Sequence, residues 1–249
     1  MSKNSDTTSA VLLLADGTVF HGHSIGHLGT SSGELCFNTG MTGYQEIFTD
    51  PSYFGQLMVM TNAHIGNYAA MAEDTESNRP QIEGLIVNEF SRVPSRPLAD
   101  QSLESYLMDH NLIGISNIDT RKLVRILRTK GAMNGIISSE ISDLDELKSL
   151  LDQTPDMAGL ELASSVTTEE PYYYGNDAAT YRIAAIDFGI KRSILKRFVE
   201  RDCYVRVYPA SATYEEISQW QPDGYFLSNG PGDPSAMDYA VKEIQKMLM

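Results

Sequence analysis

The sequence predicts an α/β protein in which a β-rich, mixed N-terminal domain is followed by an incomplete parallel sheet. Apolar runs separated by turn signals dominate residues 1–166. Residues 167–180 are polar, aromatic and rich in turn formers, which is typical of a linker. Strand and helix patterns alternate over residues 181–249, and this order predicts right-handed crossovers between parallel strands.

Composition limits the class of protein. A chain of 249 residues suits one large domain or two ordinary ones. Its 33 acidic and 19 basic residues give a net charge of −14, and this acidity argues against binding to nucleic acids or anionic membranes. No apolar stretch approaches the roughly 20 residues of a membrane span, and Met1–Ala10 lacks the apolar core of a signal peptide. Cys36 and Cys203 are far apart and show no metal-type spacing. These features predict a soluble, cytoplasmic protein with reduced thiols.

The first domain is expected to open with a hairpin. Val11–Leu14 and Thr18–Phe20 flank Asp16-Gly17, a pair that suits a type I′ turn. Further strands are predicted at 34–38, 56–61 and 84–88, and helices at 103–110, 120–129 and 144–151. Asp119 is the predicted N-cap of the helix at 120–129, and basic residues near the end of that helix suit its dipole.

The second domain is predicted to contain three strands and three helices. The strands are expected at 181–186, 204–208 and 224–227, and the helices at 190–201, 214–220 and 236–249. This is about half of a doubly wound domain. The last strand is expected at an edge that no following strand covers, which is a hazard for pairing with other chains.

The octapeptide Leu227–Pro234, Leu-Ser-Asn-Gly-Pro-Gly-Asp-Pro, is the strongest functional signal. It continues a buried strand end into a loop whose glycines and prolines give a rigid path and exposed backbone N–H groups. In an α/β sheet such a strand end is where an anion or an oxyanion is held. For Gly-Pro-Gly alone, a simple tight turn between strand and helix is favoured.

Other reactive residue types give weaker signals. All five histidines lie in the first domain, and His21 and His23 alternate on one predicted strand face. No second cluster completes a metal site, so exposed strand residues are the favoured interpretation and no metal is assigned. Cys36 and Cys203 are predicted to be packed thiols rather than nucleophiles, because neither has a neighbouring base or a nucleophile elbow.

Several longer motifs resemble a known family. They are Phe37–Glu46, Thr49–Tyr53, Ile118–Leu123, Lys130–Gly135, Asp187–Lys191 and the octapeptide. In this order they resemble the small subunit of carbamoyl-phosphate synthetase, from about Val11 to the last residue. The octapeptide resembles the oxyanion-strand loop of class I glutamine amidotransferases. The resemblance implies a small-subunit N-terminal domain over 1–166, a linker over 167–180, and the first half of a flavodoxin-like class I amidotransferase domain over 181–249.

The resemblance implies an activity shared between two subunits. The small subunit hydrolyses glutamine to glutamate and ammonia, and the large subunit uses the ammonia with bicarbonate and ATP to make carbamoyl phosphate for arginine and pyrimidine synthesis. The expected partners are therefore the large subunit, in a cytoplasmic heterodimer, and glutamine. No cofactor is expected in this chain, whereas ATP and magnesium are expected at the large subunit.

The sequence departs from the family at the catalytic residues. The family uses a Cys-His-Glu triad with its cysteine on a Gly-x-Cys-x-Gly elbow, and these 249 residues contain no such elbow. We expect the elbow and the later His-x-Pro-Glu region to lie beyond Met249, assign no catalytic residue, and expect this chain alone to lack glutaminase activity. The alternatives are a non-catalytic module that docks on the large subunit and an unrelated flavodoxin-like protein with an anion at the loop.

Three residues are expected to bind glutamine by resemblance. The Gly230 amide would supply half of an oxyanion hole, Gly232 would contact the amino-acid end of glutamine, and Ser52 would reach the same ligand from the first domain. From sequence alone, Ser52 would be a turn former after Asp-Pro. Asp233 is predicted to cap the following helix or turn rather than to transfer protons.

Overall fold

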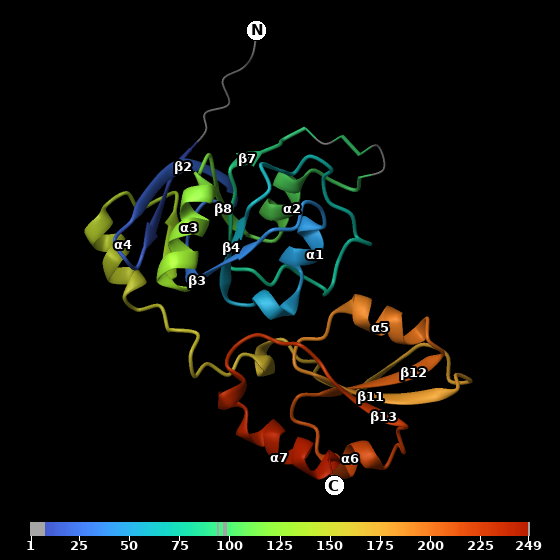
Figure 1. The fold of residues 1–249 in the computed structure, drawn as a ribbon. Coiled ribbons are helices and arrows are strands. Elements are labelled where there is room, and N and C mark those ends of the chain that lie inside the picture. The colour runs from blue at the N-terminus through green and yellow to red at the C-terminus, as the bar shows by residue number, and fades with distance from the viewer. Residues whose placement is uncertain (1–7, 94, 97–98, 249) are drawn as a thin grey trace. The chain divides into compact units, whose positions relative to one another are not determined.

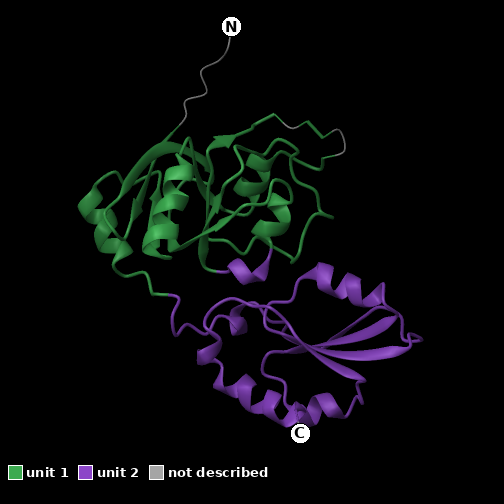
Figure 2. Ribbon diagram, viewed as in Figure 1, with its two compact units in different colours: residues 1–49, 55–156 green, residues 50–54, 157–249 purple. Residues whose placement is uncertain are grey.

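The computed structural model describes residues 8–93, 95–96 and 99–248 (Figure 1). The chain divides into two compact units, unit 1 with residues 1–49 and 55–156 and unit 2 with residues 50–54 and 157–249 (Figure 2). The short segment Asp50–Phe54 therefore groups with unit 2, although the chain on both sides of it belongs to unit 1. Within the described ranges, no helix is both long enough and apolar enough to span a membrane.

Unit 1 is built on a closed β-barrel with the strand order β1-β2-β8-β6-β4-β3-β9. The strands are β1 (Ser9–Leu14), β2 (Val19–Gly26), β3 (Thr30–Asn38), β4 (Gln56–Met60), β6 (Gly84–Ile86), β8 (Ile113–Ser116) and β9 (Asn134–Ser138). The pairs β3–β4, β4–β6 and β6–β8 are parallel, and the other four are antiparallel. Closure leaves these strands no open edge. A separate parallel pair joins β5 (His64–Ile65) and β7 (Glu89–Phe90).

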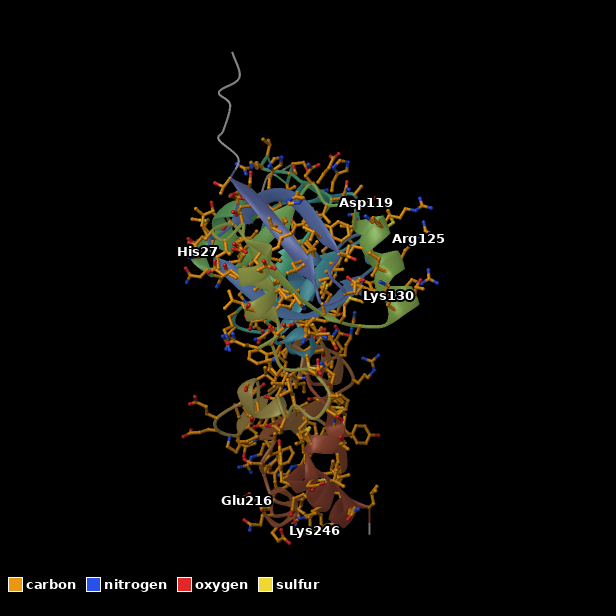
Figure 3. The ribbon with its side chains drawn as sticks, turned by 90° about the vertical axis from the view of Figure 1, so that its left-hand side faces the viewer. His27, Asp119, Arg125, Lys130, Glu216 and Lys246 are labelled. Carbon is orange, nitrogen blue, oxygen red and sulfur yellow. The ribbon has the colours of Figure 1, made fainter. Side chains whose placement is uncertain are left out.

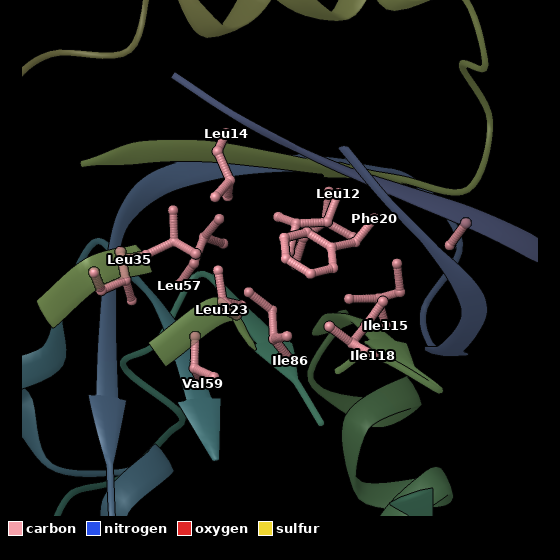
Figure 4. Packing of buried hydrophobic residues seen from close by; sticks show 13 residues of the cluster. Leu12, Leu14, Phe20, Leu35, Leu57, Val59, Ile86, Ile115, Ile118 and Leu123 are labelled. Atoms are coloured by element: carbon pink, nitrogen blue, oxygen red, sulfur yellow. The ribbon is translucent and has the colours of Figure 1, made fainter. Parts of the chain in front are cut away.

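The predicted hairpin at the start of unit 1 is confirmed. β1 and β2 pair antiparallel with Leu13 opposite Val19, and Gly17 has a φ of 83° in the connecting turn. β1 is buried on both faces. Ala10, Leu12 and Leu14 join the main core shown in Figure 4, whereas Val11 and Leu13 pack with Leu147 and Leu151 of α4 (Leu144–Leu151). This double burial explains why β1 is a continuous apolar run rather than an alternating one.

The remaining helices of unit 1 are α1 (Tyr44–Phe48), α2 (Leu103–Asp109) and α3 (Thr120–Lys130). The predicted cap of α3 is confirmed, because Asp119 Oδ1 accepts a hydrogen bond from Lys122 N at 2.8 Å. Helix α3 buries Leu123 and Leu127, while Arg125 points away from the barrel (Figure 3). Lys130, in the last turn, donates a hydrogen bond to Asp16 Oδ2 in the β1–β2 turn at 2.7 Å. The amphipathic pattern of α3 thus places its apolar stripe on the barrel core.

Unit 2 contains a four-stranded sheet with the order β10-β12-β11-β13. Its strands are β10 (Tyr172–Tyr174), β11 (Tyr181–Asp187), β12 (Cys203–Pro209) and β13 (Gly224–Leu227). β11 pairs in parallel with both β12 and β13, and β10 adds an antiparallel edge to β12. The predicted combination of a β-rich first part and a parallel sheet in the second is confirmed, and β13 lies at the edge of this sheet.

Helices cover both faces of this sheet. The helices that cover it are α5 (Arg192–Val199), α6 (Tyr214–Ser218) and α7 (Asp238–Met247). Unit 2 also contains short 3₁₀ helices at Pro51–Tyr53, Ala163–Ser165 and Pro234–Ala236. Ala185 of β11 packs with Leu195 of α5, whereas Ala184 and Ile186 pack with Ile217 of α6 and Ala240 of α7. Successive residues of β11 therefore enter different cores, as the alternation of side chains along a strand requires.

The segment 167–180, predicted as a linker, differs from that expectation. It contains the edge strand β10, and residues from Met157 onward belong to unit 2. The Tyr173 ring stacks on Tyr204 with 5.3 Å between ring centres, and the Arg206 guanidinium lies 5.1 Å from the Tyr173 ring. Aromatic packing on a neighbouring strand outweighs the polar, turn-forming residues around it. The domain boundaries at 166 and 181 remain a prediction.

Candidate functional site at the glycine loop

The octapeptide lies where two parallel strands of unit 2 end. β11 ends at Asp187 and β13 at Leu227, and Ile186 lies opposite Leu227 in the register. Ser228 Oγ joins the two following loops, because it accepts a hydrogen bond from Phe188 N at 2.9 Å and donates one to Asn229 O at 2.7 Å. The glycine loop therefore sits at the carboxyl edge of the sheet, the usual position of ligands in open α/β folds.

The backbone of Phe188 packs so closely against Gly230 that a side chain at position 230 would clash with it. A Cβ at this position would lie 2.1 Å from the carbonyl oxygen of Phe188. Gly230 is exposed, and within the described ranges its backbone N–H donates to no other group of the chain. The glycine loop thus presents an unpaired donor to solvent, which is what an oxyanion site needs.

Gly232 combines two constraints. Its φ is +82°, in the left-handed region that favours glycine, and a Cβ would lie 2.6 Å from Leu160 O. The adjacent Asp233 N donates to the same carbonyl at 2.8 Å, so the end of the loop is tied to the segment that enters unit 2.

Asp233 caps the turn that follows the loop, as predicted. Its Oδ1 accepts a hydrogen bond from Ser235 N and its Oδ2 accepts one from Gly159 N, both at 2.9 Å. The bond from Gly159 is the main cause of the lowered pKa of this carboxyl. Asp233 therefore remains ionised and holds backbone rather than transferring protons.

The structure brings Ser52 to the glycine loop. Ser52 lies in the 3₁₀ helix Pro51–Tyr53, where Asp50 Oδ1 accepts a hydrogen bond from Ser52 N at 2.9 Å. Asn229 Nδ2 donates to Ser52 Oγ at 2.6 Å, and Asp50 Oδ2 lies 3.5 Å from Lys191 Nζ. The family resemblance predicts that Ser52 reaches the ligand from the first domain, but in the structure its segment belongs to unit 2. Ser52 is a turn former as well, because Asp50 and Pro51 shape the turn that carries it.

Two supporting residues were not assigned a role from the sequence. Asp187, only 5% exposed, accepts hydrogen bonds from Gly189 N, Ile190 N and Thr168 N at 2.7–2.9 Å. Burial raises the pKa of its carboxyl, and the three N–H donors oppose that effect. The second residue is Asn229, whose side chain also donates to Gly189 O at 3.0 Å. The available signal was their position, because Asp187 is the last residue of β11, Asn229 lies two residues after β13, and a glycine follows each within two residues.

The two cysteines are embedded in strands. Cys36 lies in β3, where burial, reinforced by the charge of Glu34, raises the pKa of its thiol to about 12. Cys203 begins β12, at the opposite end of the strands from the glycine loop, and burial also raises its pKa. Both thiols are therefore protonated at neutral pH and are poor nucleophiles.

The predicted strand face of histidines is present. His21 and His23 both lie on β2, with His21 exposed and His23 half-buried. His64 Nδ1 lies 3.0 Å from Glu89 Oε2 at the surface. In the part of the chain that the structure describes, His, Cys, Asp and Glu side chains form no group of three or more that could hold a metal ion.

Comparison with known proteins shows which families the two parts of the chain match. Residues 184–249 match the family described as "Glutamine amidotransferase class-I", which places the sheet and glycine loop of unit 2 in that class. Residues 12–137 match "Carbamoyl-phosphate synthase small chain, CPSase domain". The chain belongs to the carbamoyl-phosphate synthase small chain family, as the sequence motifs indicated.

Individual relatives cover nearly all of the chain. The carbamoyl phosphate synthase small chain of a Synechococcus species is 46% identical over 98% of this chain and 66% of its own length. The corresponding protein of Escherichia coli is 43% identical over 96% of this chain and 67% of its own length. The chain thus spans about two thirds of the length of these relatives.

Proposed function

We propose that this chain carries the glutamine-binding loop of a glutamine-hydrolysing carbamoyl-phosphate synthase. In this role the small subunit releases ammonia from glutamine, and a large subunit, its partner in a cytoplasmic heterodimer, combines the ammonia with bicarbonate. The large subunit would use ATP and magnesium and release carbamoyl phosphate for arginine and pyrimidine synthesis. The family membership, the unpaired N–H of the exposed residue Gly230, and the hydrogen bond that joins the neighbouring Asn229 to Ser52 support this proposal.

The chemistry of amide hydrolysis explains the assignment of Gly230. When a thiolate attacks the side-chain carboxamide of glutamine, negative charge develops on the carbonyl oxygen. A backbone N–H aimed at this oxygen stabilises the charge, and loss of one such donor costs roughly 3–4 kcal/mol of activation free energy. Gly230 would supply one donor, while Gly232 and Ser52 would hold the amino-acid end of glutamine.

A polypeptide of these 249 residues alone is proposed to bind glutamine without hydrolysing it. Its two cysteines are protonated and packed in strands, and neither lies on a Gly-x-Cys-x-Gly elbow. The lack of a nucleophile within these residues favours, as a second candidate, a docking module that binds the large subunit without turning over glutamine.

Titration with glutamine tests the proposed site. We expect millimolar glutamine to shift the backbone amide NMR signals of Gly230 and Gly232 in the ¹⁵N-labelled polypeptide, and Ser52→Ala to weaken that effect. Unshifted loop signals would reject the glutamine site, and co-elution with the purified large subunit would then favour the docking module. Ammonia release that disappears on substitution of Cys36 or Cys203 would contradict the proposed lack of hydrolysis.

A further inference from the structure

We propose that Asn229 is a positioning residue that sets the direction of the Ser52 hydroxyl hydrogen bond, so that Ser52 donates to a carboxylate of the bound ligand. This inference rests on the proposed glutamine site and adds to it a specificity for ligands with a carboxylate at the Ser52 end. Asn229, Ser52 and Gly189 all belong to unit 2.

The hydrogen bonds of Asn229 fix the orientation of its amide. Nδ2 lies 2.6 Å from Ser52 Oγ and 3.0 Å from the carbonyl oxygen of Gly189. A flipped amide would place Oδ1 against the Gly189 carbonyl, where two acceptors would repel each other. The Gly189 carbonyl therefore requires that the nitrogen face both partners, and both of its hydrogens are used.

The direction of the Ser52 hydrogen bond follows from this orientation. An amide nitrogen has hydrogens to donate but no lone pair that accepts. Ser52 Oγ must therefore accept from Asn229, and its own O–H proton points elsewhere. Within the described ranges, this O–H finds no acceptor in the chain, and Ser52 is only half-buried. A carboxylate, which glutamine carries at its amino-acid end, is a strong charge-assisted acceptor for such a hydroxyl.

An unsatisfied acceptor in the same side chain supports a positioning role. Asn229 Oδ1 is buried and has no hydrogen-bond partner in the described structure. An unpaired buried acceptor destabilises the folded state. The loop tolerates this penalty while keeping both amide hydrogens on Ser52 and Gly189, which is the pattern expected when the two donors matter more than local stability.

The amide hydrogens of Asn229 provide a direct test that needs no ligand. We expect both side-chain N–H signals to show slow exchange with solvent, and Ser52→Ala to accelerate exchange of one of them while the other remains slow. Fast exchange of both protons in the unsubstituted chain, or no change on Ser52→Ala, would overturn the proposed hydrogen-bond direction.

A double-mutant cycle tests the role in binding. Asn229→Asp has nearly the same shape but replaces the donor by an acceptor, so Ser52 would turn its proton inward to the new carboxylate. We expect glutamine affinity, measured by amide NMR titration, to fall about tenfold or more. In a Ser52→Ala background the same substitution should have a much smaller effect, because the residue it acts through is gone.

The matched control is Asn176→Asp. Asn176 is exposed in unit 2 and uses its Oδ1 to accept from Ala178 N at 3.0 Å, so the substitution adds the same charge and retains that bond. The inference would be overturned if Asn229→Asp and the control lowered glutamine affinity equally. It would also be overturned if Asn229→Asp lowered glutamine affinity as much in the Ser52→Ala background as in the unsubstituted chain. If the unsubstituted chain shows no glutamine shift at all, the proposed function fails, while the exchange measurement still decides the hydrogen-bond direction. That measurement also decides it if Asn229→Asp does not fold.

Discussion

At the scale of the residue, a side chain larger than hydrogen does not fit at position 230. A Cβ added to Gly230 would lie 2.1 Å from Phe188 O and 2.9 Å from Phe188 C, both backbone atoms that have little room to move. We expect Gly230→Ala to lower the free energy of unfolding of unit 2 by about 1–3 kcal/mol, because the two loops must separate. Denaturant unfolding measures this change.

Gly224→Ala is the matched control for Gly230. Gly224 begins β13, and a Cβ there would meet only Ile183 Cδ1 at the ordinary contact distance of 3.4 Å. We expect the control to unfold at about the same denaturant concentration as the unsubstituted chain. Equal destabilisation by the two substitutions would show that the contact with Phe188 is not what requires glycine at 230.

The raised pKa of Cys36 predicts a dependence of stability on pH. The unfolded thiol ionises near its ordinary pKa of 9.0, whereas the folded thiol keeps its proton to about pH 12. Between these values the folded state binds more protons than the unfolded state, so stability falls as pH rises, by at most about 1.4 kcal/mol per pH unit.

Comparison with Cys36→Ala isolates this effect, because the variant lacks the ionisable group. We expect the difference in stability between the unsubstituted chain and Cys36→Ala to be constant below about pH 8, and to shift against the unsubstituted chain as pH rises above 9. Thermal unfolding at pH 7 to 10.5 measures it. A difference that stays constant over this range would show that the folded thiol ionises as readily as the unfolded one.

At the scale of the element, the start of α3 depends on one side chain. Asp119 accepts from Lys122 N at 2.8 Å and so satisfies one of the N–H groups left free at a helix start. We expect Asp119→Ala to reduce the free energy of unfolding of unit 1 by about 1 kcal/mol, and Asp119→Asn, which keeps an oxygen acceptor, to change it much less. Urea unfolding distinguishes the two, and equal losses would indicate that charge rather than capping is responsible.

Elements that are encoded by a local sequence pattern could be predicted from the sequence. The hairpin at Asp16-Gly17, the amphipathic α3 and the strand–helix alternation of unit 2 follow local patterns, and the structure contains all three. β10 was not predicted because its three tyrosines lie among polar residues. Their partners, Tyr204 and Arg206, are some 30 residues further along the chain, and pairing and packing with β12 make the segment a strand.

At the scale of the whole molecule, the two units have separate cores. Leu57 lies in the main core of unit 1 and Val205 in a core of unit 2, and both are fully buried. We expect Leu57→Ala to cost about 2–5 kcal/mol and to accelerate hydrogen exchange mainly in peptides of unit 1, with Val205→Ala acting mainly in unit 2. Exchange followed by mass spectrometry measures both variants. Acceleration throughout the chain by either one would show that the units unfold as a single cooperative body.

The sequence by itself determined the fold class, the family and the loop that carries the proposed chemistry. These depend on local patterns such as strand alternation and a glycine- and proline-rich turn at a strand end. Three features were decided only by the tertiary structure. Asp50–Phe54 groups with unit 2 rather than with its neighbours in the sequence, Asn229 donates a hydrogen bond to Ser52, and the Phe188 backbone leaves room only for glycine at position 230. The physical reason is that each of these depends on close contact between segments far apart in the chain, and no local pattern encodes the distance between them.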